Sequence, residues 1–140
     1  MTRRFHEQVE TTAGRVGALL TRGRDHRRRL ADVDVRIAVT GTRGKSSMVT
    51  WLHEAFVARG YDTYAKVTGE EPHSLYNGAC HPIERSGPVK LYETAVELER
   101  FEPVDVLVVE NQGIREYTTR LVNEDYVAPT LVVLTNVRRD

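Results

Sequence analysis

The segment 39–47, Val-Thr-Gly-Thr-Arg-Gly-Lys-Ser-Ser, has the residue types and spacing to bind a nucleotide triphosphate. Gly41 and Gly44 allow the main chain to turn tightly, with its N–H groups directed at phosphate oxygens. Lys45 can neutralise the terminal phosphates, and the Ser46 hydroxyl can coordinate magnesium. A helix that begins at Lys45 would also direct its positive end toward the anion. The segment therefore predicts a phosphate-binding loop for ATP and Mg²⁺.

The order of the surrounding elements supports this interpretation over a chance glycine-rich turn. An apolar, β-branched run precedes the loop, and an amphipathic stretch follows it, as a strand–loop–helix unit requires. The expected cofactor-binding residues of the loop are Gly41, Thr42, Arg43, Gly44, Lys45, Ser46 and Ser47.

The elements around the loop alternate between strands and helices, which predicts an α/β domain. Strands are expected at 35–40, 61–67, 104–109 and 130–134, and helices at 45–59, 89–101 and 115–122. Residues 70–89, rich in Pro, Gly and His, are expected to form a long loop. In that loop His73, Cys80 and His81 are a poor zinc set, because no second close pair of ligands accompanies them. Surface loop residues are the favoured interpretation.

Glu110 is the second residue with a predicted chemical role. It directly follows the buried strand expected at 104–109. Ligands of open α/β sheets bind at the carboxyl ends of the strands, which is also where the phosphate loop would lie. Glu110 and Ser46 are therefore the expected magnesium ligands, and Lys45 and Glu110 the expected catalytic residues. The alternative is a solvated acid that caps the next helix.

Composition and charge agree with one cytosolic domain. The 140 residues can bury a core, and the single cysteine, Cys80, excludes an internal disulfide and suits a reducing compartment. No apolar run approaches the roughly 18 residues of a membrane span, and the first residues lack the apolar core expected of a secretory signal. The net charge is zero, but residues 1–30 contain eight arginines and three acids, a net charge of +5.

Residues 1–32 are expected to form a basic helical arm ahead of the ATP-binding domain at 33–140. Phe5, Val9, Val16 and Leu20 recur on one helical face. The basic cluster comprises Arg22, Arg24, Arg27, Arg28 and Arg29. A solvated arm is favoured, and contact with anionic lipid head groups is the alternative.

The loop resembles that of the Mur ligase superfamily of ATP-dependent amide ligases. Its pattern is Gly-Thr-x-Gly-Lys followed by two hydroxyl residues, with Val39 where the longer phosphate-loop pattern has glycine. With Arg43 at its centre, the loop is most similar to that of the ligase subunit of poly-γ-glutamate (capsule) synthase, the PgsB/CapB type. The resemblance implies a three-layer, P-loop NTPase-like parallel sheet flanked by helices, the front part of the family's central ATPase domain.

Three further segments resemble the superfamily. Thr68-Gly69 is similar to a Thr-Gly loop near the nucleotide and acceptor, and Val-Val-Glu110-Asn111 is similar to the position of a magnesium glutamate. Thr135-Asn136, with Asp140, is similar to a motif whose asparagine lies by the nucleotide. The sequence ends one residue before the histidine of that motif, so we expect the front portion of a longer ligase.

The resemblance implies that a glutamate carboxylate attacks the γ-phosphate of ATP and that an amine then displaces phosphate to form an amide. It implies a glutamate or poly-γ-glutamate acceptor, membrane-bound synthase subunits and self-association as partners, and no nucleic acid. The implied location is cytoplasmic, at the inner face of the membrane. The alternatives are another Mur-type ligase (cell-wall peptide or folylpolyglutamate), a small-molecule kinase or GTPase, and a non-catalytic ATP-binding or assembly module. Thr135-Asn136 resembles a guanine motif, but Val137 and Arg138 replace its Lys and Asp.

Overall fold

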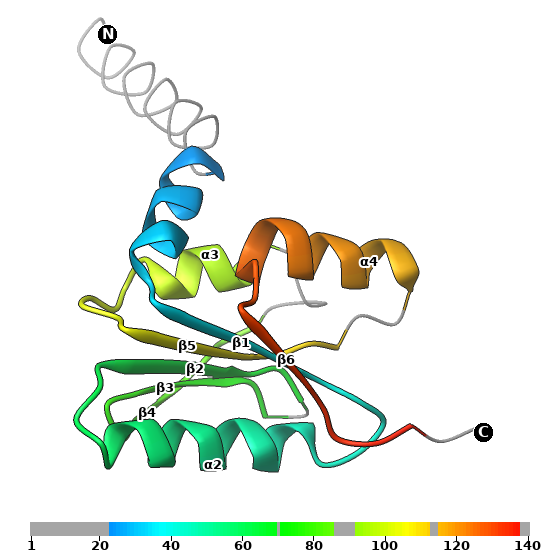
Figure 1. Cartoon of the computed structure of the whole chain (residues 1–140), viewed down its shortest axis with the longest axis horizontal. Helices are drawn as coiled ribbons and strands as arrows, with labels where there is room; N and C mark the ends of the chain where they lie inside the picture. Colours follow the sequence, from blue (N-terminus) through cyan, green and yellow to red (C-terminus); the bar gives the residue numbers. More distant parts are fainter. Residues whose placement is uncertain (1–22, 70, 86–91, 113–114, 138–140) are drawn as a thin grey trace, which may run out of the picture.

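The computed structural model describes residues 23–69, 71–85, 92–112 and 115–137, and these form an α/β domain. A six-stranded sheet of order β4-β3-β2-β5-β1-β6 lies between two layers of helices (Figure 1). The strands are β1 (Val35–Thr40), β2 (Thr63–Val67), β3 (His73–Tyr76), β4 (Ala79–Pro82), β5 (Val106–Glu110) and β6 (Leu131–Leu134). The helices are α2 (Lys45–Val57), α3 (Glu93–Leu98) and α4 (Glu116–Leu121), with α4 continuing as the π-helix η1 (Val122–Val127).

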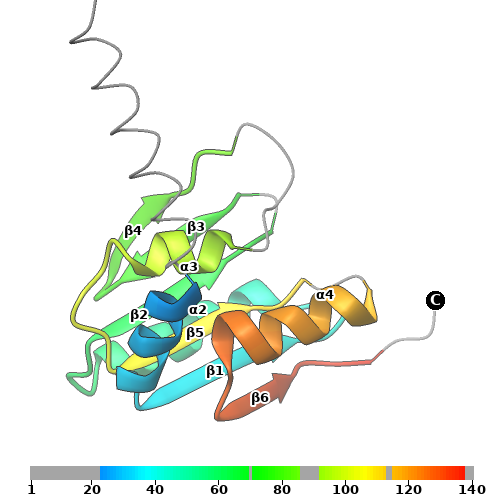
Figure 2. The same ribbon diagram turned by 90° about the horizontal axis from the view of Figure 1, so that it is seen from above.

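The sheet is mostly parallel and is covered on both faces. β1 pairs in parallel with β5 and β6, and β2 pairs in parallel with β5. Helix α2 packs on one face, while α3, α4 and the helical residues 23–32 lie over the other (Figures 1 and 2). This layering follows from strands that are apolar on both sides, since each face needs a helical cover.

The core consists of one hydrophobic cluster on each face of the sheet. On the α2 face lie Ile37, Val39, Val49, Ala65, Val67, Leu75, Val106 and Val108. On the opposite face lie Leu30, Val33, Ala38, Tyr64, Leu98, Phe101, Leu107, Val109 and Val127. Alternate residues of β1 and β5 enter opposite clusters, because successive side chains of a strand point to opposite faces.

The elements next to the phosphate loop are confirmed. β1 has the predicted bounds, and α2 begins at Lys45 as expected. The helix ends at Val57, two residues before the expected end, and Gly60 follows with a φ of +86°. Val49 is buried on α2, and so is His53, whereas Trp51 is exposed. A tight C-terminal stop at glycine is the usual way to end such a helix.

The prediction of an unstructured loop at 70–89 is wrong in its central part. β3 and β4 form an antiparallel hairpin that extends the sheet beyond β2. Asn77 and Gly78 connect the two strands, with φ values of +47° and +88°. Asn-Gly favours these left-handed conformations and is a strong hairpin signal between short strands. Proline and histidine in such short strands concealed the pattern.

The last strand, although its sequence is apolar, is not buried. β6 is an edge strand, and Leu131, Val132 and Leu134 are 52%, 51% and 58% exposed. An apolar run predicts a strand, but the position of that strand in the sheet depends on contacts between distant parts of the chain. Among the residues that the structure describes, β6 pairs with β1 alone.

Residues 23–32 pack against the sheet by one side of their helix. His26 and Leu30 are buried, and Arg36 of β1 donates hydrogen bonds to the carbonyls of Leu30 and Val33 at 2.8 and 2.7 Å. Arg29 forms ion pairs with Glu99 and Glu102. Phe5, Val9, Val16, Leu20 and Arg22 lie outside the described residues, and the boundary at residue 32 stays a prediction. None of the described helices has the length and apolar character needed to cross a bilayer.

We expect His26 to make stability depend on pH. Its Nε2 donates to the Tyr126 carbonyl at 2.8 Å, while its buried Nδ1 has no partner among the described residues. Burial, helped by the nearby Arg29 charge, lowers the pKa of His26 below 6.5. The unfolded chain therefore binds the proton more readily than the folded protein does. The stability that neutral His26 contributes is present above pH 6.5 and is lost as the pH falls toward the pKa of His26 in the folded protein.

The measurement is the free energy of unfolding by urea at about pH 7.5 and about pH 5. His26→Gln keeps a donor for Tyr126 but does not titrate, so its loss of stability on acidification should be smaller than that of the wild type. Burial also lowers the pKa of His53, so part of the decline should remain. Equally steep declines in both proteins would contradict the role of His26.

Candidate functional site

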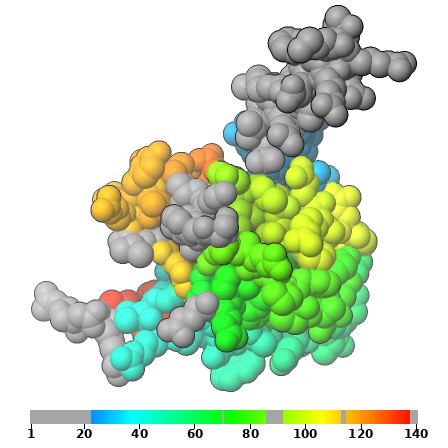
Figure 3. Space-filling view, turned by 180° about the vertical axis from the view of Figure 1, so that it is seen from behind, coloured from blue at the N-terminus to red at the C-terminus, as the bar shows by residue number. Residues whose placement is uncertain are grey.

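The register of the sheet brings the three predicted site segments to the same end of it, where the parallel strands β1, β5 and β6 finish. Val39 pairs with Glu110 across β1 and β5, and Thr40 pairs with Leu134 across β1 and β6. All three strands are parallel, so the segments that follow them leave the sheet on the same side. The phosphate loop therefore lies between Glu110 and the Thr135-Asn136 segment. Figure 3 shows the residues of the loop region (cyan) beside those that follow β6 (red) at the molecular surface.

Two glycines determine the path of the loop. Gly41 has a φ of +128°, and a Cβ there would collide with Thr135 Oγ1 and press on the main chain of Asn136. Gly44 has a φ of +79° and is the N-cap of α2, without a side-chain cap. The N–H groups of the first turn of α2 therefore remain available to an anion, at the positive end of the helix dipole.

Lys45 turns back over the loop. Its Nζ donates hydrogen bonds to the carbonyls of Gly41, at 2.8 Å, and Thr42, at 3.4 Å. The ammonium group therefore lies against the main chain of the loop. Such a charge can neutralise a phosphate bound by the loop.

Ser46 and Glu110 meet at the carboxyl end of β5. The Ser46 hydroxyl donates to Glu110 Oε2 at 3.2 Å, although 64 residues separate them. Glu110 is 4% exposed, and its Oε2 also accepts a hydrogen bond from the Thr68 N–H at 2.9 Å. The next helix, α4, begins only at Glu116 with Arg115 as N-cap, so Glu110 does not cap it. Carboxylate and hydroxyl oxygens are ligands that Mg²⁺ prefers, so this pair fits the ion chemically.

Thr68 and Gly69, which follow β2, lie next to Ser46 and Glu110. A Cβ on Gly69 would lie 3.6 Å from Ser46 Oγ, so this segment directly faces the start of α2. With its side-chain amide oriented so that the nitrogen donates to Thr68 O at 3.2 Å and the oxygen accepts from Gly69 N at 3.1 Å, Gln112 satisfies both ends of that amide here. Sequence reasoning gave Gln112 no role and did not predict the bond from the Thr68 N–H to Glu110. The Thr-Gly pair directly after a strand was the available signal.

Asn136 hydrogen bonds to the phosphate loop. Its Oδ1 accepts from the Arg43 N–H at 3.2 Å, and its Nδ2 donates to the Arg43 carbonyl at 2.9 Å. Its own carbonyl accepts from the Thr42 N–H at 3.2 Å, and the Thr135 hydroxyl donates to the Arg43 carbonyl at 2.7 Å. These bonds determine the path of the loop at Thr42 and Arg43. Asn136 therefore acts on the predicted site indirectly, by holding the main chain of the loop.

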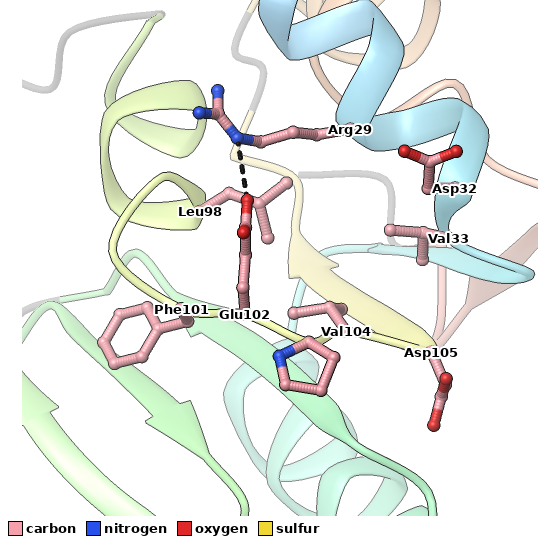
Figure 4. Close-up of a pocket in the computed structure, with 9 residues that line it drawn as sticks. Arg29, Asp32, Val33, Leu98, Phe101, Glu102, Val104 and Asp105 are labelled. Atoms are coloured by element: carbon pink, nitrogen blue, oxygen red, sulfur yellow. Dashed lines mark hydrogen bonds and ion pairs between the residues drawn. The ribbon is translucent and has the colours of Figure 1, made fainter.

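The other possible sites lie elsewhere in the molecule. His81 packs on Phe101, and His73 Nδ1 hydrogen bonds to the Glu71 carbonyl. No cluster of three or more His, Cys, Asp or Glu side chains suited to a metal occurs among the described residues. A cavity of about 540 Å³ lies near the start of β5, at the opposite end of the strands from the loop (Figure 4). The cavity is lined by Arg29, Asp32, Val33, Leu98, Phe101, Glu102, Pro103, Val104 and Asp105.

The structure thus brings the loop, Glu110 and Asn136 together, and adds Thr68 and Gln112 to them. No protein-family model matches the chain, and the searches for similar curated proteins and similar solved structures likewise found no match.

Proposed function

We propose that this chain is the nucleotide-binding part of an ATP- and magnesium-dependent amide ligase of the Mur type, acting on a glutamate acceptor in poly-γ-glutamate synthesis. The observation that carries the nucleotide part of the proposal is the 3.2 Å contact between Ser46 and Glu110, next to a glycine-shaped loop at the N-terminus of α2. The sequence of the loop, with Arg43 at its centre, supports the choice of ligase class. The fold class in this proposal is a P-loop NTPase-like sheet.

In the proposed reaction, a carboxylate oxygen of the acceptor attacks the γ-phosphorus of ATP, and ADP leaves. The amine of the second substrate then attacks the acyl carbon, phosphate leaves, and the amine loses a proton to form the amide. Phosphoryl transfer depends mainly on positioning and on neutralisation of charge. Mg²⁺, when bound, would supply part of that neutralisation and orient the phosphate oxygens.

The residues of this chain have distinct parts in that scheme. The N–H groups at the start of α2 would bind phosphate oxygens, and the ammonium of Lys45 would neutralise the terminal phosphates. Ser46 and Glu110 would hold the metal. Asn136 would keep Arg43 and Thr42 in place by its hydrogen bonds to their main chain.

Calorimetric titration with ATP and GTP, each with and without Mg²⁺, tests the nucleotide class. We expect ATP to bind more tightly with Mg²⁺ than without it. We expect GTP to compete poorly, because the Asn136 amide, which a guanine motif would use to bind the base, is hydrogen bonded to Arg43. If GTP outcompetes ATP, the ligase proposal fails. Release of ADP and formation of an amide with glutamate acceptors would then test the ligase class. Binding without turnover would leave an ATP-binding module as the function.

Glu110→Gln should reduce the gain in ATP affinity that Mg²⁺ provides, by about tenfold or more, because a carboxylate ligand is replaced by a neutral amide. ATP affinity without metal should stay close to that of the wild type. Calorimetric titrations in Mg²⁺ and in EDTA measure the two affinities.

Glu116→Gln, an exposed change at the start of α4, is the matched control and should behave as the wild type. Equal losses for Glu110→Gln with and without metal would refute the assignment of Glu110 as a metal ligand.

A further inference from the structure

A charged cluster that sequence reasoning did not single out lies close to Glu110. It comprises Lys66 on β2, Arg85 after β4 and Glu93 at the start of α3. Arg85 holds the Glu93 carboxylate with two hydrogen bonds, Nε at 2.8 Å and Nη2 at 2.7 Å. Lys66 Nζ lies 3.0 Å from the same carboxylate. Two cations thus share one acid.

The cluster is shielded from solvent. The side chains of Lys66, Arg85 and Glu93 are 3%, 15% and 12% exposed. Lys66 Nζ also donates to the Thr94 hydroxyl at 3.0 Å. Burial lowers the pKa of Lys66 despite the neighbouring Glu93. Burial would raise the pKa of Glu93, but the hydrogen bond from Arg85 and the charge of Lys66 lower it. A buried group of this kind has a fixed geometry, because every change of partner would leave a charge uncompensated.

The third nitrogen of Arg85 connects the cluster to the candidate metal site. Nη1 donates to the Thr68 carbonyl at 3.4 Å, a long, charge-assisted hydrogen bond. The N–H of the same residue, Thr68, donates to Glu110 Oε2 at 2.9 Å. A continuous series of contacts therefore runs from Lys66 through Glu93, Arg85 and Thr68 to the carboxylate that contacts Ser46.

We propose that Arg85 is a positioning residue for Glu110: held by Glu93, it fixes the Thr68 main chain, which in turn orients the carboxylate toward Ser46. This inference deepens the proposed function and rests on it where Mg²⁺ and ATP are concerned. Arginine suits the role because its planar fork binds Glu93 with two nitrogens and leaves a third for Thr68. Lysine, with one nitrogen, could not maintain all three contacts.

The test compares Arg85→Gln with Arg29→Gln. Arg29 also pairs with two glutamates, Glu99 and Glu102, but it lines the cavity near the start of β5, where Figure 4 shows its bond to Glu102. Arg85→Gln should lower the Mg²⁺-dependent gain in ATP affinity by about tenfold, the effect usual for a group that supports a metal ligand, and leave ATP affinity in EDTA within about twofold. Arg29→Gln should leave both affinities unchanged.

Hydrogen exchange of single amides, followed by NMR, provides a readout that needs no nucleotide. In Arg85→Gln the Thr68 amide should exchange about tenfold faster relative to the Ala65 amide on the same strand, since the ratio removes any change in global stability. Arg85→Lys keeps the charge but not the fork, so it should also accelerate Thr68 exchange, and it replaces Arg85→Gln if that variant does not fold.

Each outcome decides the matter. An unchanged Thr68-to-Ala65 exchange ratio would overturn the proposal, and so would equal losses of ATP affinity with and without Mg²⁺. If the wild type binds no ATP, the proposed function fails, while the exchange ratio still decides whether Arg85 fixes the contact between Thr68 and Glu110.

Discussion

Lys45→Ala is expected to weaken ATP binding by about 1.5–3 kcal/mol, or roughly 10- to 150-fold, the contribution of a hydrogen bond to a charged group. Lys45 Nζ lies on the loop, 2.8 Å from the Gly41 carbonyl, where it can turn to a phosphate without moving the helix. Its loss would remove the cation that, in the proposed function, neutralises the terminal phosphates. Calorimetric titration with ATP and Mg²⁺ measures the change.

The expected effect depends on the terminal phosphates, so AMP should bind the variant and the wild type about equally. Arg59→Ala, which removes an exposed cation just beyond the other end of α2, is the matched control and should bind ATP normally. Unchanged ATP affinity in Lys45→Ala would contradict the assignment of the loop.

The loop after β1 and its two flanking elements could be predicted because the information is local. Apolar β-branched residues, two glycines and a helical periodicity lie within 35–57, and each acts on its immediate neighbours. The approach of Glu110 to Ser46 spans 64 residues, yet it too could be predicted. Parallel strands open their carboxyl ends at one edge, so a carboxylate that follows a buried strand arrives near the loop.

The remainder of the site depends on pairing and packing that no local pattern specifies. The Thr68 N–H reaches Glu110 because β2 pairs with β5 in one particular register. Arg85 reaches Thr68 only because the hairpin of β3 and β4, which was predicted as a loop, brings it back to the end of β2. A buried lysine in the middle of a strand gives no sign of its partner in the sequence.

The exposed edge strand illustrates the same limit from the opposite direction. The Leu-Val-Val-Leu sequence of β6 resembles that of the buried β5, and a strand was correctly predicted there. β5 is covered because it lies between β1 and β2, whereas β6 occupies the end of the strand order. Strand order follows from the crossover connections, so composition alone could not distinguish the two strands.

Glu93→Gln is expected to cost about 3–5 kcal/mol of the free energy of unfolding at neutral pH, the usual effect of removing one partner from a buried ion pair. The glutamine would leave Lys66 and Arg85 close together, with no carboxylate between two largely buried cations. Since a domain of this kind is stabilised by only about 5–15 kcal/mol, the loss would be a large part of the total. Urea unfolding at pH 7 measures it, and Glu99→Gln, in the more exposed pair with Arg29, should cost less than about 1 kcal/mol.

The dependence of this difference on pH separates the charge of Glu93 from its packing. The pKa of Glu93 is lowered from 4.5, so the carboxylate contributes stability above 4.5 that is lost as the pH falls through its value in the folded protein. The difference in unfolding free energy between the wild type and Glu93→Gln should therefore shrink on acidification below 4.5. A pH-independent difference would show that the side chain acts through its shape and its neutral hydrogen bonds. Only a difference that shrinks with acid would support Glu93 as the charge that holds Arg85 against Thr68.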